Sequence, residues 1–329
     1  MTGPHAVHGP DAGSPPVARE LAEALVDAGG GQVLAVVLYG SQLHRSSPDA
    51  HSAWDLVVVV DRYPPFHRAM REAGAFRRPP LLMNLMGAIL PPYVTAFAPW
   101  GDGRPLAKCL VLRRDQFRRA MGPHSRDHFL KGRLVQHVST IWAASPEISS
   151  SLDEILADAR RETLAWTRPF LGGRQFDAVT YTQEMLAVSF AGEVRPESAD
   201  RVLEVWMAQR DWLVEVYGEV LARAAADGDL EPAGEGVYRF SHPASGWVRM
   251  ARRGYFFRSK VRGIARWFKH MVTFNDWQTY IVRKVERRTG LKVDLTEAER
   301  RWPLLLLWPK VFKVLREGRA MNQGSDAEG

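Results

Sequence analysis

The fold that the sequence predicts rests on one stretch, VLYGSQLHRSSPDAHSAWDLVVVVD, which runs from Val37 to Asp61. It joins two apolar runs, Val33–Tyr39 and Leu56–Val60, which are rich in β-branched residues and too short for helices. The first run ends in Gly-Ser, and Asp55 opens the second. A carboxylate at the head of a buried strand is costly unless it binds a metal or is paired, although an exposed strand end would also satisfy it.

The Gly-Ser step and the aspartate suggest phosphate chemistry. Gly40 has no side chain to keep backbone N–H groups away from a phosphate, and Ser41 adds a hydroxyl donor. Asp55 on a neighbouring strand can then hold Mg²⁺ against the same phosphates. We therefore predict that the two runs are adjacent strands of one mixed sheet, with Ser41 and Asp55 facing a common cleft. The alternative is a buried strand bounded by a solvated aspartate.

Length and composition indicate a globular protein of two or three domains, with 329 residues of which 46% are hydrophobic. A single cysteine, Cys109, excludes an intramolecular disulfide framework and a Cys-rich metal site, and it fits a reducing cytoplasm. Residues 1–16 fail as a signal peptide and are expected to form a disordered arm. No segment approaches the ~18 uninterrupted apolar residues of a membrane span.

Charge is concentrated near the C-terminus. The whole chain carries a net charge of +7, and residues 249–319 hold 19 Lys and Arg against 6 Asp and Glu. Such a region attracts polyanions, which means nucleic acid or an anionic lipid surface.

The order of elements predicts an α+β fold, with a mixed sheet and helices followed by a mainly helical domain and a basic amphipathic region. A helix over Val17–Ala28 precedes the two strands, the segment RYPPFHRAMREA predicts another helix, and Tyr93–Phe97 and Cys109–Leu112 are further strand candidates. The expected divisions are an arm over 1–16, a sheet domain over 17–135, a helical domain, with a winged helix as one option, over 136–236, a basic region over 237–319, and a disordered tail over 320–329.

The Gly-Ser, connector and Asp pattern resembles the DNA polymerase β nucleotidyltransferase superfamily, which usually has a second acid two residues after the first. Val57 stands at that position, and Asp61 lies about 20 Å along the strand, too far to share an ion. The segments YGS and WDLVVVVDRYPPFH more closely resemble the mitochondrial translocator assembly and maintenance type of phosphatidate cytidylyltransferase, whose strand also lacks the second acid. AKCLVL, FLKGRLVQHV and AVSFAGEVRPESADRV follow in the order of that family's blocks.

This resemblance covers about Val33 to Val202 and implies that the sheet domain is a nucleotidyltransferase domain. It implies a reaction in which CTP and phosphatidic acid give CDP-diacylglycerol and pyrophosphate, with Mg²⁺ or another divalent cation. The site residues that it implies fall into two groups. Those for catalysis and nucleotide are Asp55, Ser41, Gly40, His67, Lys108 and Arg133, and those for metal and phosphate are Asp55, Glu193 and Arg195.

Departures from the family pattern bear on the nucleotide loop and on the phosphate contacts. Gln42-Leu43 replaces Gly-Val, Glu193 replaces Asp, and Gln136-His137 replaces Lys-Pro. Each implied residue also has an ordinary alternative. His67 would lie in the first turn of a surface helix, Lys108 and Arg133 on solvated faces, and Glu193 and Arg195 in a plain ion pair.

The C-terminal region has features of a segment that lies in a membrane interface. In SKVRGIARWFKHMV, apolar residues recur at helical spacing, with basic residues elsewhere around the helix. Leu304–Leu315 is a short apolar stretch with basic flanks, and it either binds the interface or packs on the core. Anionic phosphatidic acid would be recruited by the same field. We therefore expect a peripheral protein on the inner face of the cell membrane.

Three functions follow from these features: a membrane-associated cytidylyltransferase, a nucleotidyltransferase acting on a soluble acceptor, and a noncatalytic binder of nucleic acid or another anionic surface. Nucleic acid is the weakest partner, because the basic aromatic stretches match no zinc finger or RNA-binding motif. The sequence leaves acyl-chain preference, oligomeric state and the second metal ligand open.

Overall fold

A computed structural model describes residues 14–44, 52–101, 104–194 and 198–273. Most of the predicted N-terminal arm, the C-terminal tail, Leu304–Leu315 and Arg195 lie outside these residues. Within them no helix is both long and apolar enough to cross a membrane.

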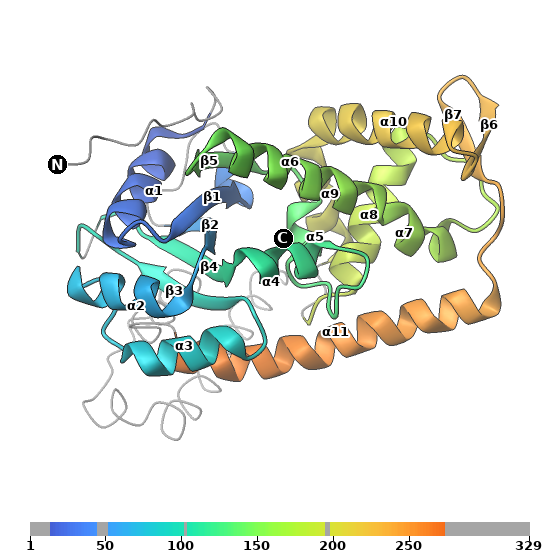
Figure 1. Ribbon diagram of the computed structural model, residues 1–329. Coiled ribbons are helices and arrows are strands. Elements are labelled where there is room, and N and C mark those ends of the chain that lie inside the picture. The colour runs from blue at the N-terminus through green and yellow to red at the C-terminus, as the bar shows by residue number, and fades with distance from the viewer. Residues whose placement is uncertain (1–13, 45–51, 102–103, 195–197, 274–329) are drawn as a thin grey trace, which may run out of the picture. The chain divides into compact units, whose positions relative to one another are not determined.

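The centre of the fold is a mixed five-stranded sheet with the strand order β3-β4-β2-β1-β5 (Figure 1). Its strands are β1 (Val33–Tyr39), β2 (Trp54–Val60), β3 (Tyr93–Phe97), β4 (Ala107–Arg113) and β5 (Ser139–Ala143). β1 and β2 pair antiparallel, as the sequence predicts, and β2 pairs parallel with β4. β2 starts two residues before the predicted run, so Asp55 lies inside the strand as its second residue.

Helices cover both faces of this sheet. The residues on both sides of β1 and β2 are therefore mostly apolar. α1 (Pro16–Ala28) and α2 (Tyr63–Glu72) pack on one face, where Leu21, Leu25, Phe66 and Met70 are buried with the strands. α4 (Arg114–Met121) and α6 (Pro146–Arg161) contact the other. β5 comes from the segment predicted to be helical and pairs with β1, so the sheet takes one strand from beyond residue 135.

The remaining elements are mostly helical. They are η1 (Ser41–Leu43), α3 (Pro80–Ala88), α5 (Lys131–Leu134), α7 (Thr163–Leu171), α8 (Ala178–Ala191), α9 (Ala199–Met207), α10 (Arg210–Ala226) and α11 (Gly246–Thr273). A hairpin of β6 (Leu230–Gly234) and β7 (Val237–Phe240) occupies the Gly- and Pro-rich segment in which the sequence suggests only a boundary. The result is an α+β fold.

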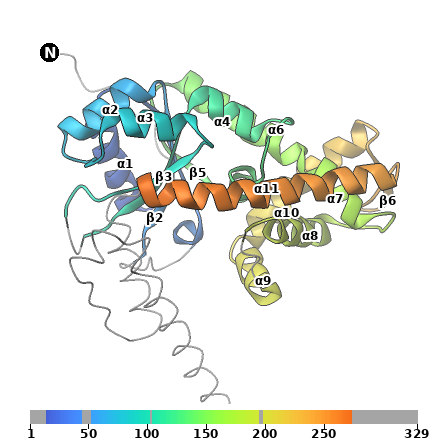
Figure 2. The same cartoon turned by 90° about the horizontal axis from the view of Figure 1, so that it is seen from below.

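α11 is the longest of these helices, and it runs alongside α3 and β3 at its C-terminal end and α7 at its N-terminal end (Figure 2). Its buried face includes Phe256 near the middle and is polar toward the C-terminal end, where Arg266, Lys269 and Thr273 are buried. The Lys269 ammonium donates to the carbonyl oxygens of Met86, Ile89, Leu90 and Pro92 at 2.6 to 3.2 Å. Arg266 has a fully buried side chain and reaches the same loop. These donors satisfy carbonyl groups of the α3–β3 loop that would otherwise be buried without partners.

The outward face of α11 carries an exposed apolar stripe. Its residues recur every three or four positions except across Gly254, and they are Trp247, Met250, Phe257, Val261, Ile264, Phe268 and Val272. Phe268, for example, is 63% exposed. The usual arrangement of an amphipathic surface helix, with its apolar side toward the core, is therefore reversed.

Candidate functional site

The end of β1 brings the backbone very close to Asp55. Gly40 has φ +86, a left-handed value that favours glycine, and a Cβ added there would lie 3.1 Å from Asp55 Oδ2. Ser41 follows as an exposed residue at the start of η1. The Gly-Ser step therefore contacts the strand that carries the aspartate.

Asp55 lies between two neighbouring strands and is paired with a cation. It is opposite Tyr39 on β1 and beside Lys108 on β4, and Lys108 Nζ lies 3.2 Å from Asp55 Oδ1. The two side chains are 29% and 35% exposed, so the pair remains open to solvent. The predicted residues Asp55 and Lys108 thus lie side by side.

Tyr39 was not among the predicted site residues. Its hydroxyl is buried and has no hydrogen-bond partner among the described residues. Burial, and then the Asp55 charge, raise the pKa of Tyr39 well above its usual value, whereas the charges of Lys108 and Arg133 act in the opposite direction. The charge of Arg133 therefore acts on the Tyr39 phenol. The partnerless phenol is a buried donor beside the candidate site.

Arg133 and Glu193 form the second ion pair of the site, with a separation of 3.0 Å. Arg133 comes from α5, where it also donates to the Phe129 carbonyl and lies 4.3 Å from the centre of the Phe129 ring. Glu193 follows α8. The structure therefore brings Arg133 and Glu193 together, but it gives the Glu193 carboxylate a guanidinium partner. Its role as a second metal ligand stays a prediction.

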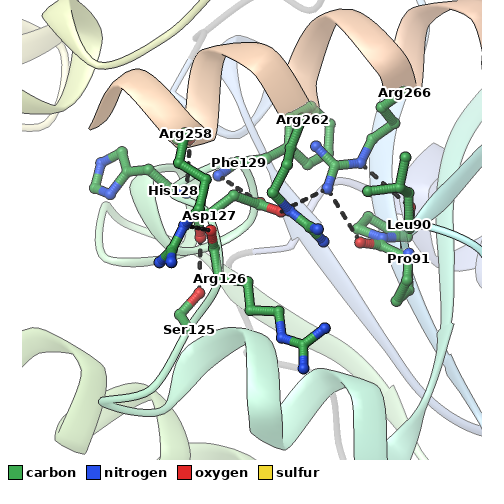
Figure 3. Close-up of polar contacts among 12 residues, drawn as sticks. Leu90, Pro91, Ser125, Arg126, Asp127, His128, Phe129, Arg258, Arg262 and Arg266 are labelled. Atoms are coloured by element: carbon green, nitrogen blue, oxygen red, sulfur yellow. Dashed lines mark hydrogen bonds and ion pairs between the residues drawn. The ribbon is translucent and has the colours of Figure 1, made fainter. Parts of the chain in front are cut away.

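α11 adds positive charge to the same region. Figure 3 shows Arg262 and Arg266 converging on Asp127, whose Oδ2 lies 2.8 and 2.9 Å from them. Burial alone would raise the pKa of Asp127, but the charges of these two arginines hold it below its usual value. Burial, and then the charges of Lys269, Arg266, Lys108 and Arg133, lower the pKa of His270 to about 3. The His270 ring lies 6.4 Å from the Phe129 ring, over which Arg133 also lies.

A pair of histidines lies next to the Gly-Ser loop. His44 follows η1, and its Nδ1 is 3.4 Å from Nδ1 of His137. Burial, and then His137, lower the pKa of His44 to about 4. His137 stacks on Trp212 with ring centres 4.8 Å apart. The signal for these residues was present in the sequence as the departure of Gln136-His137 from the family pattern, but nothing in it linked His137 to His44.

The structure places His67 on the buried face of α2 and not in the first turn of that helix, and its contact with nucleotide stays a prediction. It is 1% exposed in α2, and its ring nitrogens lie 2.6 Å from Asn84 Oδ1 and 2.7 Å from the Tyr93 hydroxyl. Tyr93 pairs with Val111, three residues along β4 from Lys108. Burial lowers the pKa of His67 to about 4. It is a neutral core histidine with both nitrogens partnered.

One residue of the site, Asp55, is suited to bind a divalent cation. Asp55 offers a partly exposed carboxylate, and Mg²⁺ is often held by one or two carboxylates together with substrate phosphates. Among the described residues no group of three or more His, Cys, Asp or Glu side chains is placed to hold an ion. Asp55 lines neither of two cavities of about 510 and 370 Å³. The cleft shared by Ser41 and Asp55 stays a prediction.

Comparison with known proteins adds no assignment. Neither the family models nor the curated proteins against which the chain was compared match it. The site is therefore defined by its geometry, in which Gly40, Asp55 and Lys108 are joined at the ends of three adjacent strands and Arg133 lies nearby.

Proposed function

We propose that the protein is a nucleotidyltransferase that transfers CMP from CTP to phosphatidic acid at an anionic membrane surface, giving CDP-diacylglycerol and pyrophosphate. The proposal rests on how closely Gly40 approaches the Asp55 carboxylate. A Cβ added to Gly40 would lie 3.1 Å from Asp55 Oδ2. This approach supports a loop that presents backbone N–H groups to phosphates beside a carboxylate. The mixed sheet supports the same reading.

The reaction needs little covalent work from the protein. A phosphate oxygen of phosphatidic acid attacks the α-phosphorus of CTP, the new P–O bond forms, and the bond to the β-phosphate oxygen breaks to release pyrophosphate. Lys108 and Arg133 would balance the negative charge of the triphosphate, and the Gly40-Ser41 backbone would orient it. Asp55 would hold a divalent cation, which supplies charge stabilisation when bound.

The reversed amphipathicity of α11 supports the membrane part of the proposal. Its exposed stripe carries aromatic and aliphatic side chains, and Arg253 and Lys260 lie beside the stripe on the helix surface. An apolar face flanked by basic residues is typical of a helix that lies in the interface of an anionic membrane. Each basic residue near such a surface contributes about 1 kcal/mol. We propose a peripheral location on the inner face of the cell membrane.

Activity of the intact chain tests this proposal. Purified protein with CTP, Mg²⁺ and phosphatidic acid in mixed micelles should release pyrophosphate and form CDP-diacylglycerol, with CTP preferred over ATP. Asp55→Ala should abolish turnover, and Ser41→Ala should reduce it less because the backbone N–H groups remain. Normal turnover by Asp55→Ala would remove this residue from the mechanism. Pyrophosphate release that needs no lipid would favour a soluble acceptor.

A further inference from the structure

A second polar cavity lies away from Asp55, on the side of α5 that faces α7 and α11. It has a volume of about 370 Å³, and its walls come from the loop after α4, from α5, from the junction of α6 and α7, and from α11. Its size is that of a small-molecule site. The residues that give it its chemistry are Lys131, Glu162, Trp166, Arg252, Tyr255 and Arg258.

Cations outnumber carboxylates in this lining. Lys131 is 3% exposed and is paired with Glu162, which is the only carboxylate among the described lining residues. One carboxylate cannot neutralise three cations, so the lining carries the positive charges of Arg252 and Arg258 in excess. The nearby Asp127 carboxylate does not balance them, because Arg262 and Arg266 occupy it (Figure 3). Burial lowers the pKa of Arg252 and of Lys131, and the charge of Glu162, which both cations share, acts in the opposite direction.

The two arginines are held in place by backbone and ring contacts. Arg252 donates to the Ala165 carbonyl at 3.3 Å, and Arg258 donates to the Arg126 carbonyl at 3.1 Å. Both guanidinium groups lie over the Tyr255 ring, at 5.4 and 6.0 Å from its centre. These contacts leave further N–H groups on each guanidinium, because each carries five and has one hydrogen bond to the residues that the structure describes.

An unpartnered donor also borders the cavity. Trp166 is 2% exposed, and its indole N–H has no hydrogen-bond partner among the described residues. A buried donor without an acceptor is costly and is usually satisfied by water or a ligand. The cavity therefore combines surplus positive charge with the planar donors of two arginines, which suit an oxygen-rich anion, and Trp166 is buried in its wall.

We infer that this cavity binds a phosphate monoester group through Arg252 and Arg258. Arginine forks match the oxygens of phosphate, which is the commonest oxygen-rich dianion that a site of this size and charge would meet. The group is supplied either by a soluble phosphate ester or by the headgroup of phosphatidic acid. The inference does not depend on the proposed transferase activity, because it concerns binding at residues outside the candidate site.

Binding to the full chain tests the inference. Titration with sn-glycerol 3-phosphate at constant ionic strength, followed by calorimetry, should give binding that Arg252→Gln/Arg258→Gln weakens at least tenfold. Arg68→Gln/Arg71→Gln is the matched control, because both arginines are exposed on α2 and neither lines the cavity. Lys108→Met should retain this binding, which separates it from phosphate bound beside Asp55. Trp166→Phe should lose the accompanying change in indole fluorescence.

A second arm distinguishes the two sources. Vesicles of phosphatidylcholine with and without phosphatidic acid replace the soluble ester. Binding of the soluble ester that depends on Arg252 and Arg258 supports a soluble ligand, and dependence on these residues with phosphatidic acid vesicles alone supports the headgroup. If the double variant and its control bind both probes equally well, the cavity is not a phosphate site and the inference is wrong.

Discussion

Lys108 and Asp55 occupy paired positions on the parallel strands β4 and β2, with 3.2 Å between the Lys108 ammonium and the Asp55 carboxylate. The pair lies at the end of the sheet where β1 gives way to Gly40. An exposed ion pair of this kind contributes little to stability, on the order of 0–1 kcal/mol. We therefore expect the pair to matter for function, in which Lys108 would bind phosphate and Asp55 would bind a cation.

The first prediction separates these contributions. Lys108→Met keeps the length of the side chain but removes its charge. We expect CTP-dependent turnover to fall at least tenfold, while the free energy of unfolding in urea changes by less than about 1 kcal/mol. Arg119→Met, which breaks the exposed pair with Asp115, should leave turnover unchanged. A loss of several kcal/mol for Lys108→Met would instead indicate a structural pair.

The second prediction concerns the closeness of Gly40 to Asp55. Gly40→Ala places a methyl group 3.1 Å from the carboxylate and puts alanine at φ +86, so we expect the free energy of unfolding to fall by about 1–3 kcal/mol. Turnover should fall as well, because the loop can no longer approach Asp55. Gly218→Ala is the control. Gly218 lies within α10 with open space around it, and alanine there should stabilise the protein by about 0.5–1 kcal/mol.

The third prediction concerns acid stability. His67 has a pKa of about 4 in the folded protein and an ordinary value of 6.5. As the pH falls from 6.5 to 4, the unfolded chain takes up a proton that the folded protein does not, so stability falls by up to about 3 kcal/mol through this residue. Unfolding in urea at several pH values should show a smaller decline for His67→Phe than for the wild type. His242→Phe, a change at an exposed histidine, should leave the decline unaltered.

The fourth prediction concerns the outward stripe of α11. Replacing Phe257, Ile264 and Phe268 by serine should reduce cosedimentation with phosphatidic acid vesicles several-fold without lowering the melting temperature, because these side chains are 47% to 71% exposed. Leu203→Ser/Met207→Ser removes comparably exposed apolar residues from α9 and should have no effect. Equal cosedimentation of both variants would mean that the stripe does not contact the membrane.

The sequence predicts the sheet better than it predicts the helices around it. β1 and β3 have the predicted bounds, because short β-branched runs between Gly and Pro leave few alternatives. β5 was missed, since the five residues of STIWA are too few for a clear period. The apolar residues over Val261–Val272 were interpreted from the sequence as the membrane-facing side of an amphipathic helix, but the contacts that turn this side outward could not be foreseen. That orientation depends on carbonyl groups near Leu90, about 180 residues earlier, which only the fold brings to Lys269.

At the candidate site, too, single residues could be recognised in the sequence, whereas contacts between distant segments could not. Asp55 and Lys108 were each recognisable, because each stands at the edge of an apolar run. The position of His270 beside Phe129 could not be read from the sequence, since it depends on where α11 lies. The burial of His67 could not be read either, because its spacing from Asp55 says nothing about Asn84 and Tyr93, which contact it in the core.

The end of α11 also bears on how the folded chain avoids self-association. β3 is an edge strand of the sheet, and Thr273 on α11 donates to the Val94 carbonyl of that strand at 2.8 Å. An open edge offers unpaired backbone groups to any other strand and is a template for aggregation. Because α11 lies against β3, it covers this edge. In a truncated chain without residues 246–273, this edge and the carbonyl groups that Lys269 binds would be exposed. We expect such a chain to aggregate through strand pairing between molecules.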